Sequence, residues 1–125
     1  EGAMPAEVYI EVVALADEAV WLVQTPSGDW SLPGGPLEEG EEPAHGARRW
    51  IARMAGVAVE EPVILEATSR HEGDRWRLIL RYACRLTQEP RPDPTLPGSG
   101  LFHIEHLPPL APDQRAAIYR AMQVL

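Results

Sequence analysis

The stretch that decides the fold is residues 30–57, WSLPGGPLEEGEEPAHGARRWIARMAGV. It begins with a short extended piece and then passes through Pro33-Gly34-Gly35-Pro36. Because proline fixes φ and glycine admits positive φ, we predict an irregular loop at this run. A helix is predicted over residues 43–55, since Pro43 suits a first helical turn and Gly56 suits a C-terminal stop.

Apolar runs on both sides of this stretch predict further strands and a second helix. The predicted strands are residues 8–16, 19–24, 63–68, 76–86 and 101–104, and the predicted helix is 112–125 with Ile118, Met122 and Leu125 as its apolar stripe. The proline-rich run 88–100 is predicted to be a loop. This pattern favours the α/β class, as an α/β/α sandwich with a mixed central sheet. At 125 residues the chain is expected to form one domain over 1–125. Glu1 to Ala3 are interpreted as an expression remnant before Met4.

Six positions from residue 35 to residue 57 follow a fixed spacing. Gly35 is followed after five residues by Glu41, and after seven more by Arg49. Ile51 supplies a bulky apolar position, and Gly56 with Val57 ends the pattern. This spacing resembles the box of the Nudix (MutT-like) family, and Trp30-x-Leu32-Pro33-Gly34-Gly35 is similar to the family's entry into the box. The segment 102–110, FHIEHLPPL, resembles the family's late segment, so the resemblance covers nearly the whole chain.

The resemblance implies hydrolysis of a diphosphate linked to another moiety, with Mg²⁺ or Mn²⁺ held by box glutamates. It also implies that Glu41 and Arg49 form a structural link. The three glutamate positions, however, hold Trp50, Arg53 and Met54. At 100° per residue these three fall on one outward stripe of the helix, where the ligands would converge. Hard cations take oxygen ligands, and a guanidinium repels them, so we predict no metal, no cofactor and no catalytic residue at the box.

The remaining residues of the pattern predict a binder of a nucleotide-like or phosphate-containing ligand. Guanidinium forks suit phosphate oxygens, and aromatic rings can stack on a base. The ligand-binding candidates are Arg49, Trp50, Arg53, Gly34, Gly35, Trp76 and Phe102. The simpler interpretation, a solvated helix face for the arginines and packing for the aromatic rings, stays open.

Two other functions also stay open. The first is an active hydrolase of a nucleoside diphosphate-linked compound, with Mg²⁺ or Mn²⁺ held by displaced ligands among Glu38, Glu39, Glu41, Glu42 and Glu72. The second is a protein-interaction or regulatory module whose docking face runs from Trp50 to Met54. A homodimer is one version of it, because many relatives associate.

The amino-acid composition limits the classes of partner and the cellular compartment that we expect. The formal net charge of −8 disfavours a nucleic acid polymer and an anionic membrane. All eleven basic residues are arginine, which we attribute to codon usage. The lone Cys84 lies in an apolar run and is interpreted as a buried thiol, which fits a reducing cytoplasm. No apolar stretch approaches the 18 residues that favour a membrane span.

Overall fold

A mixed β-sheet forms the centre of the molecule. The computed structural model describes residues 6–125, except for the side chain of Glu72, so the interpretation of residues 1–3 lies outside the described part. The strands are β1 (Ala6–Ala16), β2 (Ala19–Gln24), β3 (Trp30–Ser31), β4 (Gly34–Pro36), β5 (Val63–Glu72), β6 (Arg75–Arg85) and β7 (Ser99–His103). The main sheet order is β3-β2-β1-β6-β5, with β4 paired to β1 and β7 paired to β2. The sheet is mixed because β1 pairs in parallel with β6 and antiparallel with β2.

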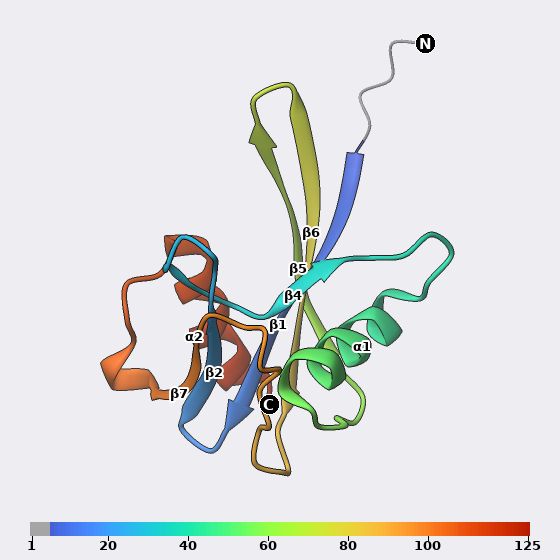
Figure 1. Cartoon of the computed structure of the whole chain (residues 1–125). Helices are drawn as coiled ribbons and strands as arrows, with labels where there is room; N and C mark the ends of the chain where they lie inside the picture. Colours follow the sequence, from blue (N-terminus) through green and yellow to red (C-terminus); the bar gives the residue numbers. More distant parts are fainter. Residues whose placement is uncertain (1–5) are drawn as a thin grey trace.

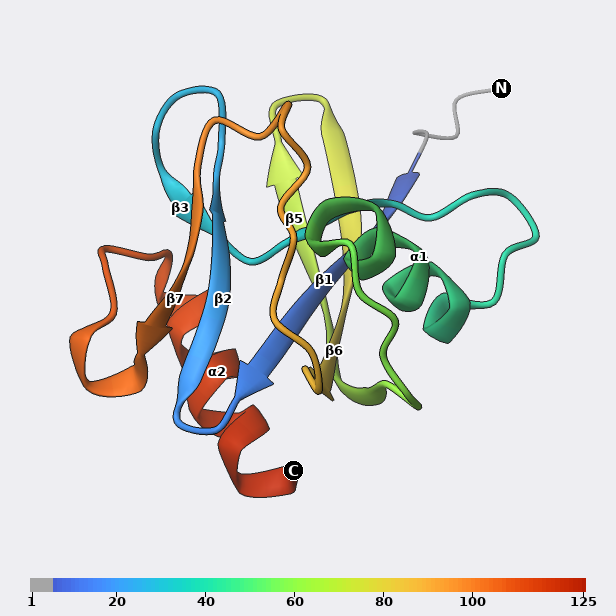
Figure 2. The same ribbon diagram turned by 60° about the horizontal axis from the view of Figure 1, so that its bottom comes forward.

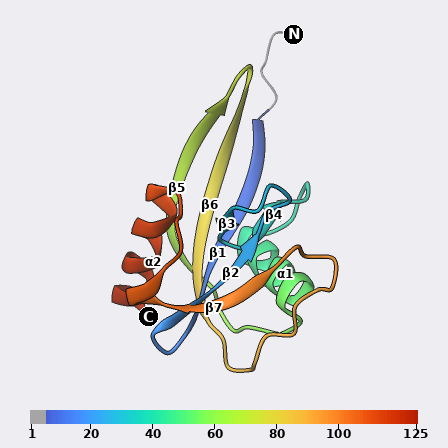
Figure 3. The same ribbon diagram turned by 60° about the vertical axis from the view of Figure 1, so that its left-hand side comes forward.

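Two helices cover the two faces of the sheet. Helix α1 (Pro43–Ala55) packs on one face and helix α2 (Pro112–Val124) on the other, with a short 3₁₀ helix at Ile104–His106 before α2. Figure 3 shows the sheet lying between the two helices. One apolar cluster joins α1 to the sheet through Ile10 and Ile51, and a second joins α2 to the opposite face through Leu22 and Ile118. The predicted α/β/α sandwich is confirmed.

The glycine-rich run differs from the prediction. Gly34–Pro36 is not irregular but forms β4, which pairs with β1 in the register Ile10↔Gly35. Apolar periodicity cannot reveal such a strand, because two of its three residues are glycines. The pairing matters for the site, since it fixes this segment against the centre of the sheet.

The hairpin of β5 and β6 is longer than predicted. Strand β5 extends to Glu72, and the hairpin projects beyond the rest of the sheet in Figure 1. A bulge in β5 between Ile64 and Glu66 lies opposite Tyr82 and Arg81. Within the described residues, no helix combines the length and apolar character needed to cross a bilayer.

Helix α1 has the predicted bounds. Pro43 lies in its first turn, and Gly56 ends it in the left-handed region at φ 68°. The β6–β7 connection, residues 86–98, then runs against this end of the helix, as Figure 2 shows. The backbone N–H of Arg91 donates to the Ala55 carbonyl at 2.6 Å, and that of Asp93 donates to the Met54 carbonyl at 2.9 Å. These bonds satisfy carbonyl groups that a helix end leaves without partners.

Candidate functional site

Glu41, just before α1, and Arg49, within α1, form a bidentate ion pair. The Nε and Nη2 atoms of Arg49 donate to the two carboxylate oxygens of Glu41 at 2.7 and 2.8 Å. Nη2 also donates to the Pro36 carbonyl oxygen at 3.1 Å, which ties α1 to β4. The hydrogen bond from Arg49 lowers the pKa of Glu41 from 4.5 to about 2. This geometry agrees with the structural link that the family resemblance implied, and it leaves Arg49 little capacity for a ligand.

Trp50 is held against β4. Its indole Nε1 donates to the Pro36 carbonyl oxygen at 2.9 Å. The ring lies so close to Gly35 that a Cβ at that position would overlap it. The guanidinium carbons of Arg49 and Arg53 lie 5.1 and 5.3 Å from the ring centroid, within cation–π range. An apolar ring between two cations therefore fills the side of α1 that faces β4.

Arg53 and Met54 face the connection that follows β6. Arg53 is exposed, and Asp93 is near enough for the charge of Arg53 to help lower its pKa, after the hydrogen bonds from Thr95. Met54 is half-buried and packs against the same apolar cluster as Ile51. The predicted outward stripe is therefore only partly correct. The spacing of 100° per residue describes α1 as an isolated helix. In the structure, β4 packs against Trp50, and residues 91–96 lie beside Met54.

The donor set on this face does not fit Mg²⁺ or Mn²⁺. The positions that would supply carboxylates supply an indole, a guanidinium and a thioether, and these hard cations take oxygen ligands. Of the acids considered as displaced ligands, Glu41 is bound by Arg49, and Glu38 is exposed with an oxygen 3.9 Å from Arg49. Among the described residues, no group of three or more His, Cys, Asp or Glu is arranged to hold a metal ion.

A cavity of about 360 Å³ opens beside Met54. No local pattern in the sequence indicates this cavity, because its walls come from β2, β3, β4, α1 and the loop before β7. Its lining residues are Val23, Gln24, Thr25, Pro26, Ser31, Leu32, Gly34, Met54, Thr95, Leu96 and Pro97. None of them is charged. The volume falls within the range of about 300–1,000 Å³ that is typical of small-molecule pockets.

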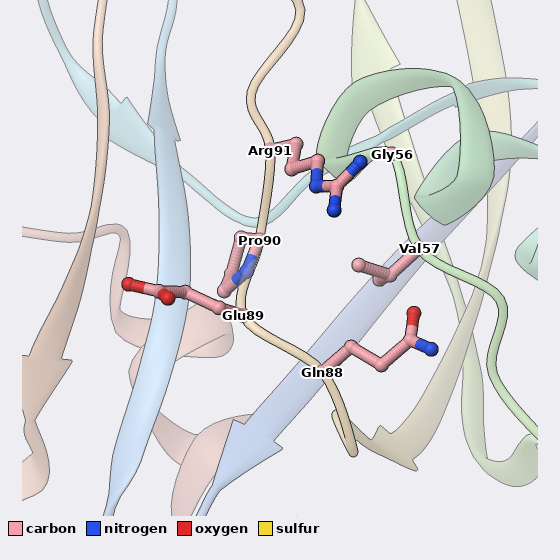
Figure 4. A pocket seen from close by; sticks show the side chains of 6 residues that line it. All are labelled: Gly56, Val57, Gln88, Glu89, Pro90 and Arg91. Carbon is pink, nitrogen blue, oxygen red and sulfur yellow. The ribbon is translucent and has the colours of Figure 1, made fainter.

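A larger cavity, of about 490 Å³, lies at the C-terminal end of α1. Figure 4 shows its lining side chains, with Arg91 extending toward Gly56 and Glu89 pointing away from both. This cavity lies past the helix end rather than on the face of Trp50. A helix C-terminus carries partial negative charge, so it disfavours an anionic ligand at that position.

Two of the predicted aromatic candidates lie away from α1. Trp76 follows the turn of the projecting hairpin and pairs with His71 and Ala6. Phe102 packs with the α2 cluster on the opposite face of the sheet, with its ring centroid 4.8 Å from that of Trp30 in an edge-to-face contact. The structure therefore brings Gly34, Gly35, Arg49, Trp50 and Arg53 together and leaves Trp76 and Phe102 apart from them.

Because Gly35 and the Trp50 ring are in contact, we expect substitutions at the two positions to have non-additive effects on the free energy of unfolding. We expect Gly35→Ala to lower the free energy of unfolding by about 1–3 kcal/mol, as overpacking does, because the new methyl group overlaps a ring held by a hydrogen bond. In a Trp50→Ala background the methyl group has room, and the same change should cost less than about 0.5 kcal/mol. Urea denaturation of the two single variants and the double variant measures this difference. Equal costs in the two backgrounds would show that the ring does not occupy this position.

Comparisons with known proteins agree with this architecture. The sequence profile described as the NUDIX domain matches residues 7–122. A MutT NUDIX hydrolase from Burkholderia pseudomallei aligns with 24% identity and a TM-score of 0.81, covering 93% of this chain and 98% of the other. A MutT protein from Methanosarcina mazei Go1 aligns with 14% identity and a TM-score of 0.76, covering 99% and 98%.

A third solved structure is described as an ADP-ribose pyrophosphatase from Streptococcus suis 89-1591. It aligns with 21% identity and a TM-score of 0.63, covering 94% of this chain and 90% of the other. Among curated proteins, none matches the chain. At these identities the structural likenesses show the fold alone.

Proposed function

The chain belongs to the NUDIX domain family, and we propose that it binds a nucleotide-like small molecule without hydrolysing a diphosphate through metal ions at residues 35–57. One observation carries the proposal. The face of α1 that points at β4 presents Trp50, bonded to the Pro36 carbonyl and flanked by Arg49 and Arg53. This arrangement offers a divalent cation two guanidinium groups, and the carboxylate of Glu41 beside them is already bound by Arg49, so cation binding there is disfavoured.

The small-molecule part of the proposal is supported by the cavity beside Met54. A concave, mostly apolar pocket beside a charged group is the usual form of a small-molecule site. Arg53 supplies a charge in this region, because it is exposed and its charge acts on Asp93, whose carboxylate accepts a hydrogen bond from Thr95 in the cavity wall. One solved relative is described as an ADP-ribose pyrophosphatase, and that description names a nucleotide-containing substrate. A nucleotide-like ligand is therefore the class we assign to this chain.

The alternative of a docking face from Trp50 to Met54 has less support. Neither side chain is among the large apolar residues that are exposed, which are Val63, Ile64, Leu101, Tyr119 and Val124. A protein partner would first have to displace β4 or residues 91–96 from this face. That displacement would break the Trp50 hydrogen bond and the backbone bonds that end α1.

Hydrolysis assays test the proposal directly. We expect no turnover of ADP-ribose, UDP-glucose or nucleoside triphosphates that depends on Mg²⁺ or Mn²⁺ and disappears on chelation. Robust turnover of this kind would overturn the proposal. As a matched gain-of-function control, the triple variant Trp50→Glu, Arg53→Glu and Met54→Glu should bind Mn²⁺ measurably in titration calorimetry, whereas the unmodified chain should not.

A further inference from the structure

Strand β5 lies at an edge of the sheet, and its outer side has no partner strand in the described part of the chain. It extends over 10 residues, Val63–Glu72, and pairs only with β6. Within residues 6–125, no backbone group of this strand forms a hydrogen bond outside that pairing. The outer side therefore presents a row of N–H and C=O groups that can pair with a strand of another chain.

This edge is only partly protected against such pairing. A bulge between Ile64 and Glu66 interrupts the start of the strand, whereas residues 66–72 pair with β6 without a register shift. Residues 66–72 contain no proline and no lysine, which commonly block an exposed edge. The regular part of β5 is therefore the segment available to a second strand.

Two opposite charges lie on one face of this regular part. Glu66 binds Arg120 and Arg70 binds Asp113, so both side chains point to the face that carries α2. The Glu66 and Arg70 side chains are nevertheless 25% and 36% exposed. Arg70 donates to Asp113 through Nη2, and its other N–H groups can bind a further carboxylate.

Symmetry determines how this strand can pair with its own copy. In antiparallel pairing about a two-fold axis, residues at equal distances from the axis lie opposite each other on the same face of the sheet. An axis at Thr68 places Glu66 of each copy opposite Arg70 of the other. An axis at Glu66 or at Arg70 would place that residue opposite itself, with like charges together. An axis at Ala67 or Ser69 would leave one of the two charges opposite the uncharged Thr68.

We propose that two copies of the chain pair through β5, antiparallel about a two-fold axis at Thr68, and so form a symmetric dimer. A second copy is the occupant of this edge because the same strand supplies both charges in complementary order. The new ion pairs extend contacts that already exist, since Arg70 joins Asp113 and Glu66 joins Arg81 within each chain. This inference concerns assembly, so it goes beyond the proposed ligand and does not depend on it.

The other face of β5 can accommodate the second strand. Because side chains alternate along a strand, Ala67 and Ser69 point away from α2, and both are exposed. With the axis at Thr68, Ala67 of each copy lies opposite Ser69 of the other. Small side chains therefore meet across the axis, and neither has to move to admit the second strand.

The dimer also covers exposed apolar side chains at the start of β5. Val63 and Ile64 are 41% and 52% exposed. In the same alignment they lie beside positions 73 and 72 of the other copy, at the end of the β5–β6 hairpin. That end projects beyond the rest of the sheet in its own chain (Figure 1). Burial of this apolar surface adds to the backbone pairing and the ion pairs.

Sedimentation velocity over a range of protein concentrations tests the dimer. Because pairing through one strand makes a small interface, we expect the chain to be dimeric at roughly 100 µM and to dissociate on dilution. Hydrogen exchange at the outward-facing N–H groups of residues 66–70 should slow as the concentration rises. Exchange in β7, which also pairs with one strand only, should not change.

Two charge variants at the exposed positions test the register. Ala67→Lys with Ser69→Lys places lysines opposite each other on both sides of the axis and should weaken the dimer at least on the order of tenfold. Ala67→Lys with Ser69→Glu places opposite charges together in both pairs and should restore the dimer. The control is Ala52→Lys with Ala58→Lys, which adds positive charge at exposed positions outside β5 and should leave the dimer unchanged.

The outcomes separate this inference from the proposed function. A chain that stays monomeric throughout the concentration range would overturn the inference and leave the proposed ligand unaffected. A dimer that tolerates both lysines would have its interface elsewhere, which also overturns it. If the lysine–glutamate combination does not restore the dimer, the axis at Thr68 is wrong. Circular dichroism of each variant checks that the fold is retained.

Discussion

Replacing Arg81 with methionine should lower the free energy of unfolding by about 3–5 kcal/mol, the usual cost of removing one partner from a buried ion pair. Arg81 has no solvent exposure and donates to Glu11 Oε1 at 2.7 Å, Glu66 Oε2 at 2.5 Å and Asp113 Oδ2 at 2.5 Å. One guanidinium thus joins β1, β5 and α2 to β6. Methionine matches its length but leaves three carboxylates crowded around an apolar side chain.

The pKa values of Glu66 and Asp113 show that the Arg81 guanidinium stabilises the ionised form of both carboxyl groups. Burial alone would raise the pKa of Glu66 and Asp113, but the hydrogen bonds and charge of Arg81, together with those of Arg120 at Glu66 and Arg70 at Asp113, outweigh it and lower both. Arg120 and Arg70 support Glu66 and Asp113, respectively, from the outer side of the cluster. A carboxyl group with a lowered pKa contributes stability that is present above its ordinary value and is lost as the pH falls through the lowered one. In the unmodified chain we therefore expect stability to fall as the pH drops below 4.5 and 3.8, the ordinary values of these two groups.

Urea denaturation at neutral and acidic pH tests both expectations. Arg81→Met should lose stability mainly at neutral pH and show a weaker decline on acidification, because Glu66 and Asp113 gain less from being ionised when only Arg120 and Arg70 remain beside them. The matched control is Arg85→Met, which removes an exposed arginine from the same strand and should change the stability by less than about 0.5 kcal/mol. A loss below about 1 kcal/mol at Arg81 would mean that the cluster is stabilised by its outer arginines instead.

This cluster also shows why part of the structure could not be predicted from the sequence. Arg81 was visible as one of three arginines spaced along a predicted strand, but its partners lie 15, 32 and 70 residues away. No local spacing indicates which carboxylates a folded sheet will bring together. The strands themselves were predictable, because apolar runs and turn residues are local patterns.

The same distinction applies to the site. The ion pair of Glu41 and Arg49 was predicted because it belongs to a spaced motif that the sequence displays. The packing of β4 and residues 91–96 against Trp50 and Met54 was not predicted, because the spacing of residues along one helix cannot show which other segments pack against it. The cavity beside Met54 was missed for the same reason, since its walls are contributed by five separate segments of the chain. Local pattern therefore identified the helix that carries the candidate site, and tertiary packing determined which of its side chains are covered.

Gly34→Ala is the second change for which we expect a large effect, a loss of about 3 kcal/mol or more in the free energy of unfolding. A Cβ at Gly34 would overlap the carbonyl oxygen of Ile10 and crowd the Cα of Glu11. Both obstacles are backbone atoms of β1, the strand at the centre of the sheet, so neither can rotate away as a side chain can. The residue also has φ +157°, a conformation that L-amino acids rarely adopt. Overpacking usually costs about 1–3 kcal/mol, and we place this substitution at or above the upper end because only the backbone can yield.

The loss at Gly34 should be accompanied by a local change at the site. Strand β4 can relieve the overlap only by moving away from β1, and Pro36 would then carry its carbonyl away from Arg49 and Trp50. We expect tryptophan fluorescence to shift to longer wavelength before global unfolding, as the indole becomes hydrated. Gly100→Ala in β7 is the control, because its Cβ would meet only the Phe102 ring, at 3.6 Å, an ordinary contact distance. If Gly34→Ala unfolds like its control and keeps the native fluorescence, then β4 does not lie against β1 as closely as the Gly34 geometry requires. In that case the Pro36 carbonyl would also not hold the Trp50 indole against β4.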